Sequence, residues 1–154
     1  MSIIYLKGDA TDPQAGGHKV ITHICNDIGG WGKGFVLAVS KKWKGPEAAY
    51  RKWYKSGTDF KQGNIQLIPV TEDISVANMI GQKGIYPEDG VPPIRYESVE
   101  SCLEKLAAAL DKETSIHMPR IGCGLAGGKW ELIEPIIEKT LVNKGFAVYV
   151  YDYD

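Results

Sequence analysis

KVITHICNDIGGWGKG, residues 19–34, is the stretch that decides how this chain folds. Its first half is an apolar run of strand length, rich in β-branched residues, and it leads directly into four closely spaced glycines. Beyond the glycines, residues 35–43 place apolar side chains at helical intervals. The stretch therefore predicts a strand, a glycine-rich loop and a helix in immediate succession.

A second segment repeats this order nearer the C-terminus. Residues 115–118 form a short strand-like run, PRIGCGLAGG follows at residues 119–128, and residues 130–141 show helical apolar spacing. Glycine permits a positive φ and close approach of a ligand, so each loop can aim several backbone N–H groups at an anion, and the helix N-terminus adds to that attraction. Because ligands gather at the carboxyl ends of strands in such sheets, the two loops are expected to face one site that suits a diphosphate.

The remaining segments extend the alternation of strands and helices. Strands are predicted over residues 3–7, 64–70, 75–80 and 147–151, and helices over residues 46–54 and 96–110. This order predicts an α/β fold with three layers, α/β/α, around a mixed, mostly parallel central sheet. A length of 154 residues predicts a single domain over residues 1–154.

Composition restricts the classes of function. A formal charge of −1 argues against a broad positive field for duplex DNA, and the basic residues around Lys41 and Lys42 are interpreted as a solvated helical face. No apolar stretch is long enough for a membrane span and the N-terminus lacks signal-peptide features, so a cytoplasmic location and no membrane contact are expected. The three cysteines lack zinc-site spacing, and the sequence predicts neither a metal nor a cofactor.

The glycine loops also differ from the common nucleotide-binding motifs. Neither contains a Walker GK[ST] sequence, and neither gives the dinucleotide fingerprint in its usual first turn, so an ATPase or a nicotinamide dehydrogenase is disfavoured. For either loop alone, the alternative is that its glycines only form tight turns. A third possibility is an unrelated nucleotide-binding α/β protein.

Three segments together resemble the macrodomain signature, and they span nearly the whole chain: GDAT at residues 8–11, HICNDIGGWGKG at residues 23–34 and MPRIGCGLAG at residues 118–127. The branch that it is similar to includes terminal ADP-ribose glycohydrolases and yeast-type ADP-ribose-1''-phosphate phosphatases. The resemblance implies that the ligand is ADP-ribose or a derivative, and that the protein is a hydrolase or, alternatively, a non-catalytic reader. ADP-ribosylated protein is then a possible partner, and nucleic acid is expected only as an ADP-ribosylated substrate.

The resemblance also implies which residues bind the ligand. Asp9, beside Ala10, would receive the adenine amino group, although an Asp in this position is also common in turns. Tyr151 matches the stacking aromatic better than Tyr153, and the alternative is that both tyrosines only cover a sheet edge. The residues implied around the distal ribose and diphosphate are Asn26, Gly30, Gly32, Lys33, Gly34 and Phe35 from the first loop and Ile121, Gly122, Cys123, Gly124, Leu125 and Ala126 from the second.

Two catalytic routes are open from the sequence. Lys83 resembles the lysine with which the glycohydrolase branch attacks the ribose anomeric carbon, but Ala126 stands where those relatives have an Asp, and a lysine here is also typical of a solvated surface. For phosphate ester hydrolysis, Asp27 or His23 would orient or deprotonate water and Asn26 would hold the ribose hydroxyls. The alternatives are that His23 is a hydrogen-bonded core histidine and that Asp27 caps a turn.

Overall fold

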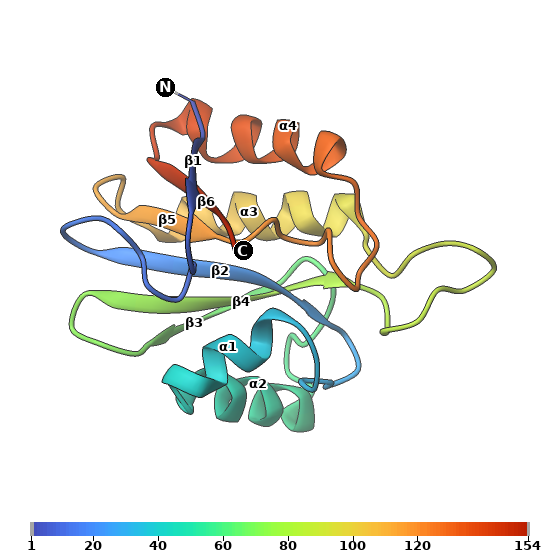
Figure 1. The fold of residues 1–154 in the computed structure, drawn as a ribbon. Coiled ribbons are helices and arrows are strands. Elements are labelled where there is room, and N and C mark those ends of the chain that lie inside the picture. The colour runs from blue at the N-terminus through green and yellow to red at the C-terminus, as the bar shows by residue number, and fades with distance from the viewer. Residues whose placement is uncertain (1, 154) are drawn as a thin grey trace.

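A computed structural model describes residues 2–153, in which a six-stranded sheet lies between two layers of helices (Figure 1). The strands are β1 (Ile4–Lys7), β2 (Lys19–Asn26), β3 (Ile65–Pro69), β4 (Ile74–Gln82), β5 (Ser115–Met118) and β6 (Val148–Asp152). The helices are α1 (Phe35–Lys42), α2 (Gly45–Ser56), α3 (Tyr96–Ala109), α4 (Trp130–Thr140) and the short 3-10 helix η1 (Val142–Lys144). The predicted α/β/α layering is confirmed, with element boundaries within two residues of the predicted ones.

The sheet has the order β1-β6-β5-β2-β4-β3. Each neighbouring pair is parallel except β3 and β4, which run antiparallel, so the predicted mixed, mostly parallel sheet is confirmed. Seven of the eight residues of β2 are buried, because helices cover both faces of this central strand.

Two hydrophobic clusters hold the layers together. Helices α1 and α2 cover one face, where Val39 and Tyr50 pack against the sheet. Helices α3 and α4 cover the opposite face through a larger cluster that includes Leu103, Leu106 and Ile133. In residues 2–153 no helix is long and apolar enough to cross a membrane.

The carboxyl ends of β2, β4 and β5 meet at one edge of the sheet, where the two glycine-rich loops begin (Figure 1). The β2–β4 pairing shifts by one residue between Cys25 and Asn26, which redirects the chain as it enters the first loop. The long connection over residues 83–95 extends outward from the same edge. The fold therefore brings three loops to one rim.

Candidate binding site at the carboxyl edge of the sheet

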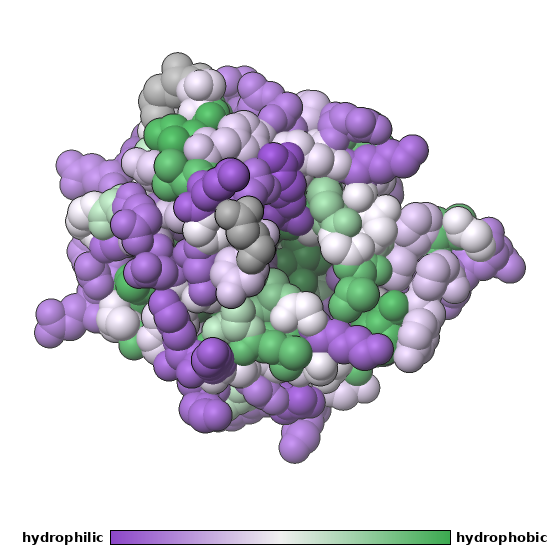
Figure 2. Space-filling view, in the orientation of Figure 1, coloured by the Kyte–Doolittle hydropathy of each residue, from purple (hydrophilic) through white to green (hydrophobic). Residues whose placement is uncertain are grey.

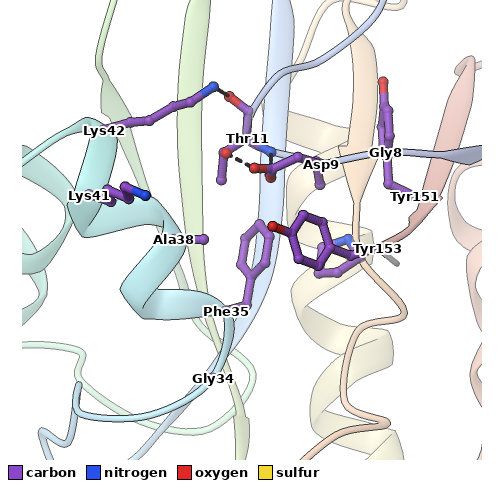
Figure 3. Close-up of a pocket in the computed structure, with 12 residues that line it drawn as sticks. Gly8, Asp9, Thr11, Gly34, Phe35, Ala38, Lys41, Lys42, Tyr151 and Tyr153 are labelled. Carbon is purple, nitrogen blue, oxygen red and sulfur yellow. Dashed lines mark hydrogen bonds between the residues drawn. The ribbon is translucent and has the colours of Figure 1, made fainter.

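A pocket of about 630 Å³ opens between the loop after β1, helix α1 and the end of β6 (Figure 3). Its lining comes from residues 8–11, from the face of α1 that starts at Phe35, from Pro119 and from the end of β6. Figure 2 shows a hollow with hydrophobic residues at its base on this side of the molecule. Its size suits a nucleoside-sized ligand.

Asp9 presents a carboxylate to this pocket. Its Oδ1 accepts hydrogen bonds from the Thr11 amide at 2.8 Å and from Thr11 Oγ1 at 2.7 Å, which is the turn geometry that an Asp favours. Within residues 2–153, Asp9 Oδ2 makes no hydrogen bond. One oxygen therefore fixes the turn while the other can accept a hydrogen bond from a ligand, and the two interpretations of Asp9 are compatible.

The aromatic residues in the pocket differ from the expectation. Phe35 and the largely exposed Tyr153 line it, with their rings in the space between α1 and the end of β6 (Figure 3). Tyr151 touches the pocket wall, but its side chain is only 2% exposed and points away from Phe35 and Tyr153. Phe35 and Tyr153 are therefore the aromatic rings open to this pocket, whereas the Tyr151 ring is buried in its wall, and stacking of a base on Tyr151 stays a prediction.

The first glycine loop exposes a row of unused backbone donors. In the described part of the chain, the N–H groups of residues 32–36 donate to no protein acceptor, and the N-terminus of α1 has no side-chain cap. Gly34 has a φ of 84°, a conformation that favours glycine, and it turns the chain into α1. Donors of this kind at a helix N-terminus form an anion site.

The second glycine loop has the same character and meets the first. The N–H groups of Gly122, Gly124, Leu125 and Ala126 have no acceptor among residues 2–153. A methyl group placed on Gly34 would lie 3.7 Å from Leu125 Cδ1, so the Leu125 side chain of the second loop lies next to Gly34 of the first. The predicted convergence of the two loops at one rim is therefore confirmed.

His23 and Asn26 lie beneath the site. His23 is 2% exposed, its Nε2 lies 2.6 Å from Asn78 Oδ1, and burial lowers its pKa to about 4. Asn26 Oδ1 accepts hydrogen bonds from the Ile28 and Gly30 amides at 3.0 and 2.9 Å, and its Nδ2 donates to the Gly30 carbonyl at 2.8 Å. His23 therefore lies as a hydrogen-bonded histidine in the core, and the Asn26 side chain holds the loop from within, while the roles expected for both at the distal ribose stay predictions.

Asp27 and Lys83 lie at the outer rim, next to the loop over residues 83–95. Asp27 Oδ1 accepts a hydrogen bond from the Gly84 amide at 2.7 Å, and Oδ2 accepts one from Gln62 Nε2 at 3.0 Å. The half-exposed Lys83 ammonium lies 3.4 Å from Glu88. Ala126 is buried, its carbonyl accepts a hydrogen bond from the Ile94 amide at 3.1 Å, and its methyl side chain offers no carboxylate.

Several pocket residues were not predicted from the sequence to contact a ligand. Ala38, Lys41 and Lys42 lie on the face of α1 that Phe35 begins, and Lys42 Nζ donates to the Thr11 carbonyl at 2.7 Å. The spacing of three and of six or seven residues from Phe35 was the available signal, because side chains at these intervals share one side of a helix. Lys41 and Lys42 are therefore pocket residues and not only a solvated face. Among residues 2–153, no cluster of potential metal ligands occurs.

Comparison with solved structures gives two close matches. A Bacteroides thetaiotaomicron protein of unknown function is 62% identical with a TM-score of 0.97, and it covers 99% of this chain and 98% of its own. A macrodomain protein from Streptomyces coelicolor is 48% identical with a TM-score of 0.88, covering 99% of this chain and 100% of its own.

Comparison with curated proteins adds two relatives. A mouse chromodomain-helicase-DNA-binding protein 1-like is 32% identical over 97% of this chain, which spans only 18% of that protein's length. An ADP-ribose 1''-phosphate phosphatase from Candida albicans is 25% identical over 96% of this chain and 99% of its own. No protein-family model matches the chain.

Proposed function

This chain belongs to the macrodomain family, and on that premise we propose that it binds ADP-ribose and hydrolyses derivatives of it, with ADP-ribose 1''-phosphate as the best-supported substrate. The observation that carries the proposal is that two adjacent glycine loops have unused backbone donors, directly beside a pocket that holds an acceptor carboxylate. A diphosphate next to an adenosine has matching charge, length and hydrogen-bond donors.

In the proposed complex, the adenine amino group donates to Asp9 Oδ2 and the base lies against Phe35 and Tyr153. The diphosphate accepts hydrogen bonds from the free amides of the two loops, and the helix dipole of α1 favours its charge. The distal ribose then extends toward the rim that Asp27 and Gly84 form.

Hydrolysis of ADP-ribose 1''-phosphate consumes one water and gives ADP-ribose and inorganic phosphate. Water attacks the phosphorus, the P–O bond to the distal ribose breaks, and the ribose oxygen leaves with a proton. Asp27 is an acidic side chain at the rim that can orient the water, because each of its oxygens can accept a further hydrogen bond beside the one from Gly84 or Gln62. The loop amides stabilise the developing charge.

The second candidate is a reader module that binds ADP-ribose without hydrolysing it, and the surroundings of Ala126 and Lys83 favour it. The buried Ala126 has no carboxylate to assist a lysine adduct at Lys83, and Lys83 itself has Glu88 as a partner. A reader would bind ADP-ribosylated protein and release nothing. Removal of ADP-ribosyl groups from acidic side chains is a further hydrolase activity, which would combine binding of ADP-ribosylated protein with turnover.

We expect ADP-ribose to bind at least about tenfold more tightly than AMP by calorimetry, because AMP lacks the second phosphate and the distal ribose. Incubation with ADP-ribose 1''-phosphate should release phosphate, and Asp27→Asn should reduce that release while ADP-ribose still binds. Asp111→Asn, in the connection before β5 at the opposite edge of the sheet, is the matched control. Equal affinity for the two nucleotides would contradict the proposal, and binding without product from this substrate or from ADP-ribosylated acidic side chains would establish the reader.

A further inference from the structure

Tyr151 forms a buried polar chain beneath the loop that carries Asp9. Its hydroxyl accepts a hydrogen bond from the Gln14 amide at 2.8 Å and lies 2.8 Å from His117 Nδ1. The other ring nitrogen of His117, Nε2, lies 2.7 Å from Ser115 Oγ. His117 is fully buried and its ring is stacked on Tyr149, with centroids 4.7 Å apart.

The contacts fit one consistent set of hydrogen-bond directions. The Tyr151 oxygen accepts the Gln14 N–H, and its own proton can be donated to an unprotonated His117 Nδ1. In that arrangement the proton of the neutral imidazole resides on Nε2 and is donated to Ser115. Burial, with a smaller effect of the Lys19 ammonium, lowers the pKa of His117 to about 4, which agrees with a neutral ring.

Among residues 2–153, three hydrogen bonds tie residues 8–14 of the loop between β1 and β2 to the rest of the fold. The Gly8 amide donates to the Asp152 carbonyl at 3.0 Å where the loop begins, and Lys42 donates to the Thr11 carbonyl from α1. The contact of Gln14 with Tyr151 is the third, and it ties the far side of the loop to the sheet. Asp9 lies between these attachment points, so its carboxylate keeps its direction only while the loop keeps its shape.

We propose that Tyr151 is a positioning residue: its hydroxyl, oriented by His117, fixes the loop that carries Asp9 and thereby sets selectivity for adenine. This inference rests on the proposed ADP-ribose site and adds to it the origin of base discrimination. Tyr151 acts through the loop and not by stacking, because its side chain is buried and points away from the other pocket aromatics (Figure 3).

The test compares Tyr151→Phe with Tyr149→Phe. Each variant loses one hydroxyl from β6, but within residues 2–153 the Tyr149 hydroxyl has no hydrogen-bond partner. Calorimetry would use ADP-ribose and its hypoxanthine analogue, IDP-ribose, which presents a carbonyl where adenine has its amino group. In Tyr151→Phe we expect the Kd of ADP-ribose to rise about fivefold to tenfold while that of IDP-ribose changes much less, and in Tyr149→Phe the ratio should stay as in the wild type. An unchanged ratio in Tyr151→Phe, or an equal loss for both ligands, would overturn the inference.

A ligand-free measurement separates this inference from the proposed function. Amide hydrogen exchange over residues 9–18 should be faster in Tyr151→Phe than in the wild type, with the largest change at Gln14, and unchanged in Tyr149→Phe. Equal exchange in all three proteins would overturn the positioning role even if ADP-ribose binds. If the wild type binds neither ligand, the proposed function fails, and exchange alone still decides whether Tyr151 holds the loop.

Discussion

The two carboxylate oxygens of Asp9 differ in their hydrogen bonds. Oδ1 accepts hydrogen bonds from the Thr11 amide and hydroxyl, whereas Oδ2 accepts none among residues 2–153 and is the oxygen that we propose for the ligand. A single substitution can therefore affect the turn, the binding, or both, depending on which atoms it removes. Asparagine keeps one acceptor oxygen in nearly the same shape and replaces the other oxygen with a donor.

We expect Asp9→Asn to retain the turn and to lose roughly tenfold or more in affinity for ADP-ribose, because an amide N–H then meets the adenine amino group. Asp9→Ala should lose binding and also about 1 kcal/mol of stability, since Thr11 loses its acceptor. Calorimetry and urea denaturation measure the two effects separately. The exposed Asp12→Asn in the same loop is the control, and wild-type affinity in Asp9→Asn would remove the adenine assignment.

Other single residues show where sequence reasoning fails. β2 is buried on both faces, so alternation could not tell whether His23 points to the site or to the core. Tyr151 and Tyr153 are two residues apart, which predicts a shared face only while the strand continues, and β6 ends at Asp152. Their different directions depend on that boundary, which is the part of an element that sequence predicts least well.

At the scale of elements, the second glycine loop is shaped by the chain packing on itself. The Gly128 amide donates to the Gly122 carbonyl at 2.7 Å, and a methyl group on Gly128 would lie 2.4 Å from that oxygen. At Gly124 the same methyl group would meet nothing within 4 Å. The sequence predicted a loop at this position. Which glycines have no room for a side chain depends on the folded path of the loop, which brings Gly128 against the Gly122 carbonyl.

Gly128→Ala should therefore destabilise the protein by about 2–4 kcal/mol and weaken ADP-ribose binding, because the backbone of the loop has to move. Gly124→Ala is the matched variant in the same loop, and its stability should stay within about 0.5 kcal/mol of the wild type. Chemical denaturation of both variants compares them directly. Equal stabilities would mean that the loop tolerates the displacement and that its shape is not set by this contact.

For the whole molecule, the layering and the meeting of the two loops followed from the alternation of elements. The direction of β3 could not be predicted in the same way. The sequence shows β3 and β4 as two adjacent β-rich runs, and an antiparallel pair needs only a short connection, but the hydrophobic pattern alone does not report strand direction. The hydrogen-bond partners of the buried polar side chains also could not be predicted from the sequence. The Asn78 side chain contacts His23 through Oδ1 and donates from Nδ2 to the Pro46 carbonyl and to Gln66 Oε1, both at 3.1 Å. These three partners come from three separate elements, β2, α2 and β3.

Two buried neutral histidines give the whole fold a defined response to acid. The pKa of His23 and that of His117 are each lowered from 6.5 to about 4, chiefly by burial. Between these values the unfolded chain binds more protons than the folded one, so stability is full above pH 6.5 and is lost as the pH falls toward 4. Carboxylates with lowered pKa values, such as Glu47 and Asp152, act in the same direction only at lower pH, since their ordinary values lie below 5.

From pH 7 to pH 5 we therefore expect the free energy of unfolding to fall by about 2 kcal/mol for each of the two histidines. Urea denaturation at several pH values in this range measures the free energy of unfolding. The slope of that free energy against pH reports up to two protons taken up on unfolding. His18→Gln is the matched control, because it replaces an exposed histidine and removes no buried imidazole. A flat profile down to pH 5 would mean that His23 and His117 ionise in the folded protein as readily as in the unfolded chain, which would contradict the lowering of their pKa values by burial.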